Sequence, residues 1–146
     1  MNNVLYFVEG LHSASLSHNG LLSLEPFEQK ITINEVKKSL EEFNLTERKT
    51  FKDVYEFNNE NLILEVVLKS KDNFYDDKET DVKDLNYYVQ LVEFIEVTLQ
   101  KTLKKTDLNI IEKIMKTFNL NIYHIETLSR CKNKDELIKL LVKIGY

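Results

Sequence analysis

The chain has 146 residues, of which 42% are hydrophobic and 30% are charged, and its formal net charge is −4 at pH 7. This balance excludes a disordered or membrane-embedded class, and it argues against generic affinity for nucleic acid or anionic membranes, which needs a basic surplus. Cys131 is the single cysteine, so no internal disulfide can form, and we expect one cytoplasmic domain spanning residues 1–146.

The first third of the chain is predicted to contain strands and one short helix. Asn3–Glu9 is apolar on both faces and predicts a well-covered strand, and Leu21–Leu24 predicts a short strand after a polar loop. Thr32 and Glu35 have the spacing of a capping box, in which a hydroxyl and a carboxylate each satisfy a free backbone donor. A helix is therefore predicted from this point to about Asn44.

A β-hairpin is predicted over residues 51–70. Apolar residues alternate with polar ones in the second strand, at Leu62, Leu64, Val66 and Leu68. Residues 58–61 read NNEN, which is suitable chemistry for the turn between the strands. One face of the hairpin is expected to be buried. An alternative for residues 46–53 is the beginning of a helix.

After the hairpin the apolar period changes from two to about 3.6. One stripe steps by three and four residues and consists of Leu85, Tyr88, Val92, Ile95, Leu99 and Leu103. This spacing predicts a long helix over about 84–105. Such an apolar helix either forms the core of one domain or is shared across the interface of a homodimer.

The C-terminal part is predicted to contain a helix, a strand and a second helix. Thr106 and Asp107 are expected to cap the first helix, residues 120–126 predict the strand, and Asn133 with Glu136 caps the last helix. The predicted class is therefore α+β. A small mixed or antiparallel sheet (the N-terminal strand, the 51–70 hairpin and the 120–126 strand) is packed by the 84–105 helix and three shorter helices.

The net charge of the chain resides in one segment. Residues 72–84 read DNFYDDKETDVKD, with a local balance of −4, and the rest of the chain is neutral. An acidic surface steers encounter with a basic one, and aromatic side chains supply anchors that charge lacks. The predicted partner-binding residues are Asp72, Phe74, Tyr75, Asp76, Asp77, Glu79, Asp81 and Asp84. The alternative is a solvated loop whose acids complement the start of the following element.

These features favour a binding protein that is not an enzyme and needs no cofactor or metal. Alanine, proline, glycine and arginine are scarce and lysine, asparagine and isoleucine abundant, which indicates an AT-rich gene. We therefore expect a small regulator or inhibitor from a phage or mobile element of an AT-rich bacterium, of the anti-defence (anti-CRISPR) or immunity type. Its predicted partner is the basic surface of another protein, such as a nucleic-acid-binding enzyme.

A metal-dependent enzyme is the first alternative. Val8-Glu9-Gly10, directly after a hydrophobic strand, resembles the opening motif of Toprim nucleases and primases, where a glutamate at this position helps hold catalytic magnesium. The resemblance covers Val4–Gly10 and implies a nuclease or nucleotide-processing enzyme that uses Glu9 with acids near Asp72. Glu9 with His12 and His18 is also a candidate zinc set, although its spacing matches no familiar zinc pattern.

A nucleic-acid-binding regulator is the second alternative. The C-terminal part carries a modest basic surplus, made up of Lys101, Lys104, Lys105, Lys113, Lys116, Arg130, Lys132 and Lys134. Binding of duplex nucleic acid usually requires clustered arginine and a stronger positive charge, so this alternative ranks below protein binding. His124 and Cys131 are expected to be structural.

Overall fold

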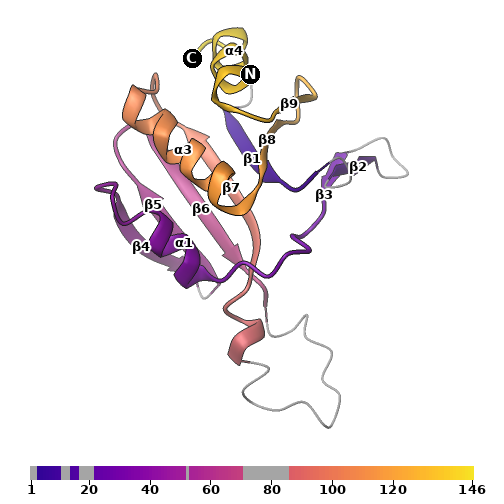
Figure 1. Ribbon diagram of the computed structural model, residues 1–146, viewed down its shortest axis with the longest axis vertical. Helices are drawn as coiled ribbons and strands as arrows, with labels where there is room; N and C mark the ends of the chain where they lie inside the picture. Colours follow the sequence, from indigo (N-terminus) through magenta and orange to yellow (C-terminus); the bar gives the residue numbers. More distant parts are fainter. Residues whose placement is uncertain (1–2, 11–13, 17–21, 52, 71–85) are drawn as a thin grey trace.

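The computed structural model describes residues 3–10, 14–16, 22–51, 53–70 and 86–146. Its main element is a seven-stranded sheet with strand order β4-β5-β6-β7-β1-β8-β9, seen in Figure 1. All six neighbouring pairs in this sheet are antiparallel. Strands β2 and β3 form a separate two-stranded sheet. The predicted α+β class is confirmed, and the sheet is larger than the sequence suggested.

The bounds of the elements are as follows. The strands are β1 (Val4–Val8), β2 (Ala14–Leu16), β3 (Leu22–Leu24), β4 (Thr46–Phe51), β5 (Val54–Asn58), β6 (Leu62–Leu68), β7 (Val92–Leu99), β8 (Asn121–His124) and β9 (Ser129–Cys131). The helices are α1 (Ile33–Ser39), α3 (Lys105–Phe118) and α4 (Lys134–Lys143).

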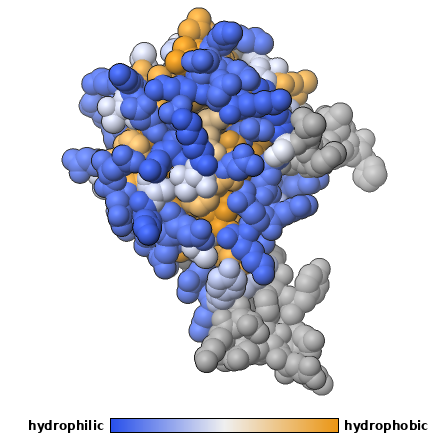
Figure 2. Space-filling model, in the orientation of Figure 1, coloured by the Kyte–Doolittle hydropathy of each residue, from blue (hydrophilic) through white to orange (hydrophobic). Residues whose placement is uncertain are grey.

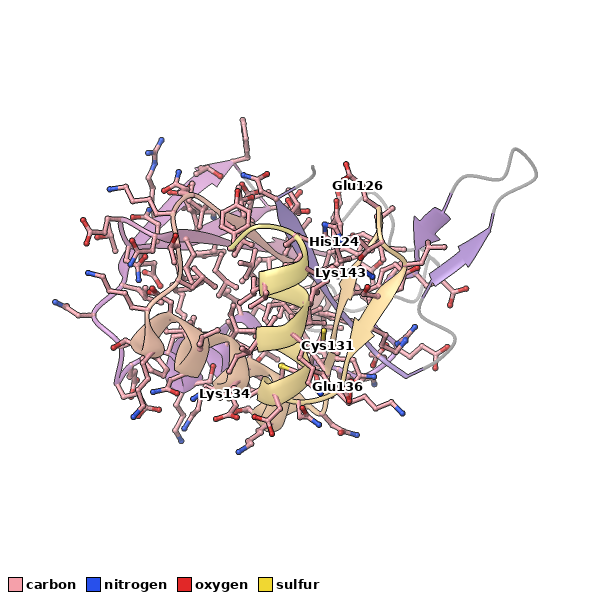
Figure 3. The ribbon with its side chains drawn as sticks, turned by 90° about the horizontal axis from the view of Figure 1, so that it is seen from above. His124, Glu126, Cys131, Lys134, Glu136 and Lys143 are labelled. Carbon is pink, nitrogen blue, oxygen red and sulfur yellow. The ribbon has the colours of Figure 1, made fainter. Side chains whose placement is uncertain are left out.

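Helices α1 and α3 lie next to each other on one face of the large sheet, in front of strands β4–β7 in Figure 1. Helix α4 packs beside β9 at the upper end of the molecule, as Figures 1 and 3 show. Alternate residues of β6, from Leu62 to Leu68, are buried on this face together with Ile111 and Ile114 of α3. Because side chains alternate between the faces of a strand, one face of each central strand is apolar and closes the core.

The caps predicted for α1 and α4 form as expected, whereas Thr106 lies within α3 and does not cap it. The Thr32 hydroxyl accepts a hydrogen bond from the Glu35 amide at 3.3 Å, and the Glu35 carboxylate accepts one from the Thr32 amide at 3.1 Å. Asn133 caps α4 by accepting from the Glu136 amide at 2.9 Å. Helix α3 begins at Lys105, slightly before the predicted cap, and Asp107 acts from within its first turn.

The hairpin is confirmed, with β5 and β6 joined by residues 59–61, although Phe51 belongs to the preceding strand β4. The stretch before it is also a strand: β4 pairs with β5 along the margin of the sheet, so the helical alternative for residues 46–53 is wrong. Glu47, Arg48 and Lys49 are exposed on β4. Charged side chains on an edge strand discourage pairing with another chain.

The predicted long helix over 84–105 is wrong, because Val92–Leu99 is strand β7 in the middle of the sheet. The register gives the reason. Val92 lies opposite Leu68 and Phe94 lies opposite Val67, so Glu93 is an extra residue in a β-bulge. Val92 and Ile95 both face the core although they are three residues apart, and this step imitates a helical period. The argument for a dimer built on that helix no longer holds.

Figure 2 shows the surface in the orientation of Figure 1, from the side of α1 and α3. Hydrophilic residues cover most of it, and apolar residues show in a band near its middle and at its upper edge. In the part of the chain that the structure describes, no helix is long and apolar enough to cross a membrane.

Candidate interaction surface

The residues predicted to bind a partner all lie outside the described residues. They are Asp72, Phe74, Tyr75, Asp76, Asp77, Glu79, Asp81 and Asp84. His12 and His18 lie outside them as well. The prediction for this segment therefore stays a prediction.

Glu9 has partners within the fold. Its carboxylate accepts hydrogen bonds from the backbone amides of Glu28, at 2.6 Å, and Gln29, at 3.0 Å. The side chain thus joins the end of β1 to the segment that leads into α1. Across the described ranges, no group of three His, Cys, Asp or Glu side chains is arranged to hold a metal ion.

Several of the C-terminal basic residues have partners on the protein. Lys113 pairs with Glu42 at 3.1 Å, Lys104 with Glu60 at 3.8 Å and Lys116 with Glu112 at 3.7 Å. The Lys134 ammonium donates to the Asn109 side chain at 2.7 Å. The three ion pairs lower the positive charge that this part of the surface presents to a polyanion.

His124 and Cys131 are both buried, and Figure 3 shows Cys131 beside α4 near Glu136. The Cys131 thiol donates to the Glu136 carbonyl at 3.4 Å, and Nδ1 of His124 lies 2.8 Å from the Thr127 hydroxyl. Burial, with a smaller effect of the Glu136 charge, raises the pKa of Cys131 to about 11. A buried thiol with this pKa is not a nucleophile at neutral pH.

The sheet face opposite the helices, called the open face here, carries a line of chemically distinctive side chains. Directly paired residues on antiparallel strands point to the same side, so the strand register identifies this line. It crosses all seven strands and is called the transverse row. In order across the sheet its members are Arg48, Glu56, Glu65, Glu96, Tyr6, Tyr123 and Arg130.

Three carboxylates occupy the middle of the transverse row. Glu56 lies opposite Glu65 and Glu65 lies opposite Glu96, on β5, β6 and β7. These three residues are called the glutamate trio. None of the ion pairs among the described residues includes a member of the trio. Asn58 donates to Glu56 at 2.7 Å.

Two members of the trio interact directly. Burial, the negative charge of Glu65 and a hydrogen bond between the two side chains all raise the pKa of Glu96. Two carboxyl groups can form a hydrogen bond only when one of them is protonated, so the proximity of Glu65 makes loss of the Glu96 proton less favourable. Beside it, burial and then the charge of Glu96 raise the pKa of Tyr6.

The other half of the row is aromatic. Tyr6 lies opposite both Glu96 and Tyr123, and the Arg130 guanidinium lies over the Tyr123 ring, 5.6 Å from its centroid. Arg130 also donates to the Gly10 carbonyl oxygen. Tyr123 is only 7% exposed, yet it lies outside the main core cluster. Among the described residues, no hydrogen bond engages the hydroxyl of Tyr6 or Tyr123.

A second line on the open face runs beside the transverse row. Its members are apolar, lie in direct register on β4–β7, and are called the apolar row: Phe51, Val54, Val67 and Phe94. None of them belongs to the core cluster, and Phe51 is 74% exposed. The open face therefore offers acidic, aromatic and apolar side chains side by side.

Two hollows in the described part of the chain lie elsewhere. One, of about 490 Å³, lies between the end of α1 and α3, and the other, of about 260 Å³, lies between α3 and the start of α4. Neither is lined by a member of the transverse row. The row crosses all seven strands, and a surface of this extent suits contact with another macromolecule better than enclosure of a small substrate.

The sequence-based reasoning missed the glutamate trio, although half of its signal was present. A four-residue turn at 58–61 pairs Phe57 with Leu62, which puts Glu56 and Glu65 on the same face but two residues out of register. In the structure the closing pair is Asn58 with Ile63, and Glu56 lies opposite Glu65. Glu96 was missed because residues 84–105 were predicted to be helical, which put Glu96 on a helix surface. Comparison of the chain with protein-family models, with curated proteins and with solved structures finds no match.

Proposed function

We propose that this chain is a protein-binding regulator that recognises a cationic surface of its partner through the open face of the sheet. The register of the glutamate trio carries this proposal. Like charges directly opposite each other on neighbouring strands destabilise a sheet, by roughly 0.2–1 kcal/mol per pair. A bound ammonium or guanidinium group removes that repulsion. Relief of the repulsion therefore makes the free energy of binding more favourable.

The hydrogen-bonding capacity of the row supports the same ligand chemistry. The trio offers carboxylate oxygens, and Tyr6 and the mostly buried Tyr123 offer hydroxyl groups that have no partner among the described residues. Lysine has three donors and arginine five, and neither has an acceptor, so both match a surface that is rich in acceptors. Charge-assisted hydrogen bonds to carboxylates are also the stronger kind.

The acidic segment predicted from the sequence fits the same proposal. In the chain, residues 72–84 connect β6 to β7, the two strands that carry Glu65 and Glu96. Charges in both places favour encounter with a basic partner and make the association rate depend on salt. Proteins that bind nucleic acid carry basic surfaces of this kind, so an inhibitor of such a protein is our preferred interpretation.

The test compares two variants with equal changes of charge. The row variant is Glu65→Gln/Glu96→Gln, and the matched control is Glu41→Gln/Asp135→Asn, at exposed positions outside the row. The partner is captured from a lysate of the source organism with wild-type protein, identified by mass spectrometry, purified and titrated with all three proteins. We expect the row variant to bind at least tenfold more weakly and with a shallower salt dependence, and the control to bind like wild type. Equal affinity of the row variant and wild type would rule out the open face as the binding surface.

A further inference from the structure

The spacing of the glutamate trio limits the shape of the element that can bind it. Neighbouring strands are about 4.8 Å apart, so the three carboxylates repeat at about that interval along a line perpendicular to the strands. One turn of an α-helix rises about 5.4 Å, whereas residues on the same side of an extended chain are about 6.8 Å apart. Over the two intervals of the trio, the mismatch between the helical turns and the carboxylates adds up to only about 1 Å. For an extended segment, the mismatch between its same-side residues and the carboxylates adds up to about 4 Å.

The apolar row adds a second constraint. It runs parallel to the trio at a separation of two residues along each strand, which is about 6.8 Å. A helix with its side chains is about 10–12 Å wide, so one helix laid across the strands covers both lines. Its cationic stripe then meets the trio, and its neighbouring apolar stripe meets Val54, Val67 and Phe94.

From this geometry we infer that the partner presents a basic amphipathic α-helix, which lies across strands β5, β6 and β7 on the open face. Lysine or arginine residues on three successive turns meet the glutamate trio, and an adjacent apolar stripe contacts the apolar row. The cationic stripe is short, because Arg48 and Arg130 stand at the two ends of the transverse row and repel further positive charge. The inference rests on the proposed function and specifies the shape of the partner's contact element.

Three synthetic peptides of identical composition test the inference. The first is a helix stabilised by a side-chain cross-link, with lysines at positions i, i+4 and i+7 and an apolar stripe beside them. The second has the same cross-link, but its lysines are distributed around the helix. The third has alternating lysine and apolar residues and favours an extended chain. Each is titrated against the full-length protein, and affinity is measured by fluorescence anisotropy.

We expect the striped helix to bind at least tenfold more tightly than either of the other peptides. The affinity for this peptide should fall at least fivefold in the row variant Glu65→Gln/Glu96→Gln and, separately, in Phe94→Ser. The affinity of the control variant Glu41→Gln/Asp135→Asn should be unchanged. Similar affinities for all three peptides, tighter binding of the extended peptide, or no binding of the striped helix would overturn the inference. The proposed function fails only if the purified partner binds the row variant as tightly as it binds wild type. The two failures are therefore distinguishable.

Discussion

At the scale of single residues, the contact between Glu65 and Glu96 is the least expected feature of the sheet. Thr, Val or a Lys–Glu pair at these positions would stabilise the two central strands, whereas two glutamates in direct register oppose each other. Proteins depart from locally favourable choices chiefly at functional sites. This departure supports the proposal that the open face binds a partner.

Neutralising one of these two residues should stabilise the protein, and only above acidic pH. The pKa of Glu96 is raised in the folded protein, so its ionisation opposes folding once the pH exceeds the unfolded value of about 4.3. This penalty grows until the pH passes the folded pKa and is absent in acid, where both states are protonated. We expect Glu96→Gln to raise the free energy of unfolding by roughly 0.5–1 kcal/mol at pH 7.5 and by almost nothing at pH 3.5.

Urea unfolding of wild type, Glu96→Gln and Glu41→Gln at the two pH values checks this expectation. Glu41 is exposed at the end of α1, and its substitution should have little effect at either pH. A Glu96→Gln protein that is less stable than wild type at pH 7.5 would show that the carboxylate has a favourable partner. The row would then lose its repulsive character.

At the scale of elements, local signals predicted most of the secondary structure and failed at β7. The capping box at Thr32, a turn within residues 58–61 and the cap at Asn133 depend only on neighbours in the sequence, so they were predicted correctly. In β7, one inserted residue in the bulge shifts the side-chain alternation and gives the sequence a three-residue step. The β-branched residues Val92, Ile95, Val97 and Thr98 were the available sign of a strand.

Cysteine substitutions across β7 should show an alternation of two. Positions 95 and 97 face the core, and positions 94, 96 and 98 face the open side. In proteins carrying single substitutions from Phe94→Cys to Thr98→Cys, we expect a maleimide to react at least tenfold faster at 94, 96 and 98 than at 95 and 97. Cys131 contributes little background, because it is buried and its thiol pKa is raised to about 11. Fast reaction at position 97 together with position 94, which are three residues apart, would instead indicate a helix.

The candidate site was less predictable than the fold, because it depends on pairing between distant segments. The placement of Glu56 and Glu65 on one face follows from a local turn and was accessible from the sequence, although the predicted turn put them two residues out of register. The pairing of Glu65 with Glu96, and of Glu96 with Tyr6, joins strands that are about 30 and 90 residues apart in the chain. A one-residue change in either register would move Glu96 to the opposite face, and no local pattern determines these registers.

At the scale of the whole molecule, one buried carboxylate connects the sheet to the helix layer. Asp107, in the first turn of α3, is 2% exposed and accepts hydrogen bonds from the side chains of Asn59, at 2.8 Å, and Asn61, at 2.9 Å. It also accepts from the Lys104 amide at 2.7 Å. The β5–β6 turn is thus held against the beginning of α3, and this contact helps to set how the two layers pack.

Replacing Asp107 with alanine should destabilise the whole fold. The substitution removes three hydrogen bonds and leaves buried amide donors without an acceptor, at a cost of roughly 3 kcal/mol in the free energy of unfolding. Asp135→Ala, at an exposed position in the first turn of α4, should cost at most about 1 kcal/mol. Equilibrium urea unfolding measures both values. A loss at Asp107 no greater than that at Asp135 would mean that the network does not couple the layers.

The charged margin formed by β4 has a consequence for how this protein meets others. Glu47, Arg48 and Lys49 follow one another along that strand, so a polypeptide approaching it alongside would face ammonium, guanidinium and carboxylate groups in alternation. Extension of the sheet by a foreign strand is therefore disfavoured there. A partner of the kind proposed above would therefore bind the open face more readily than this edge of the sheet.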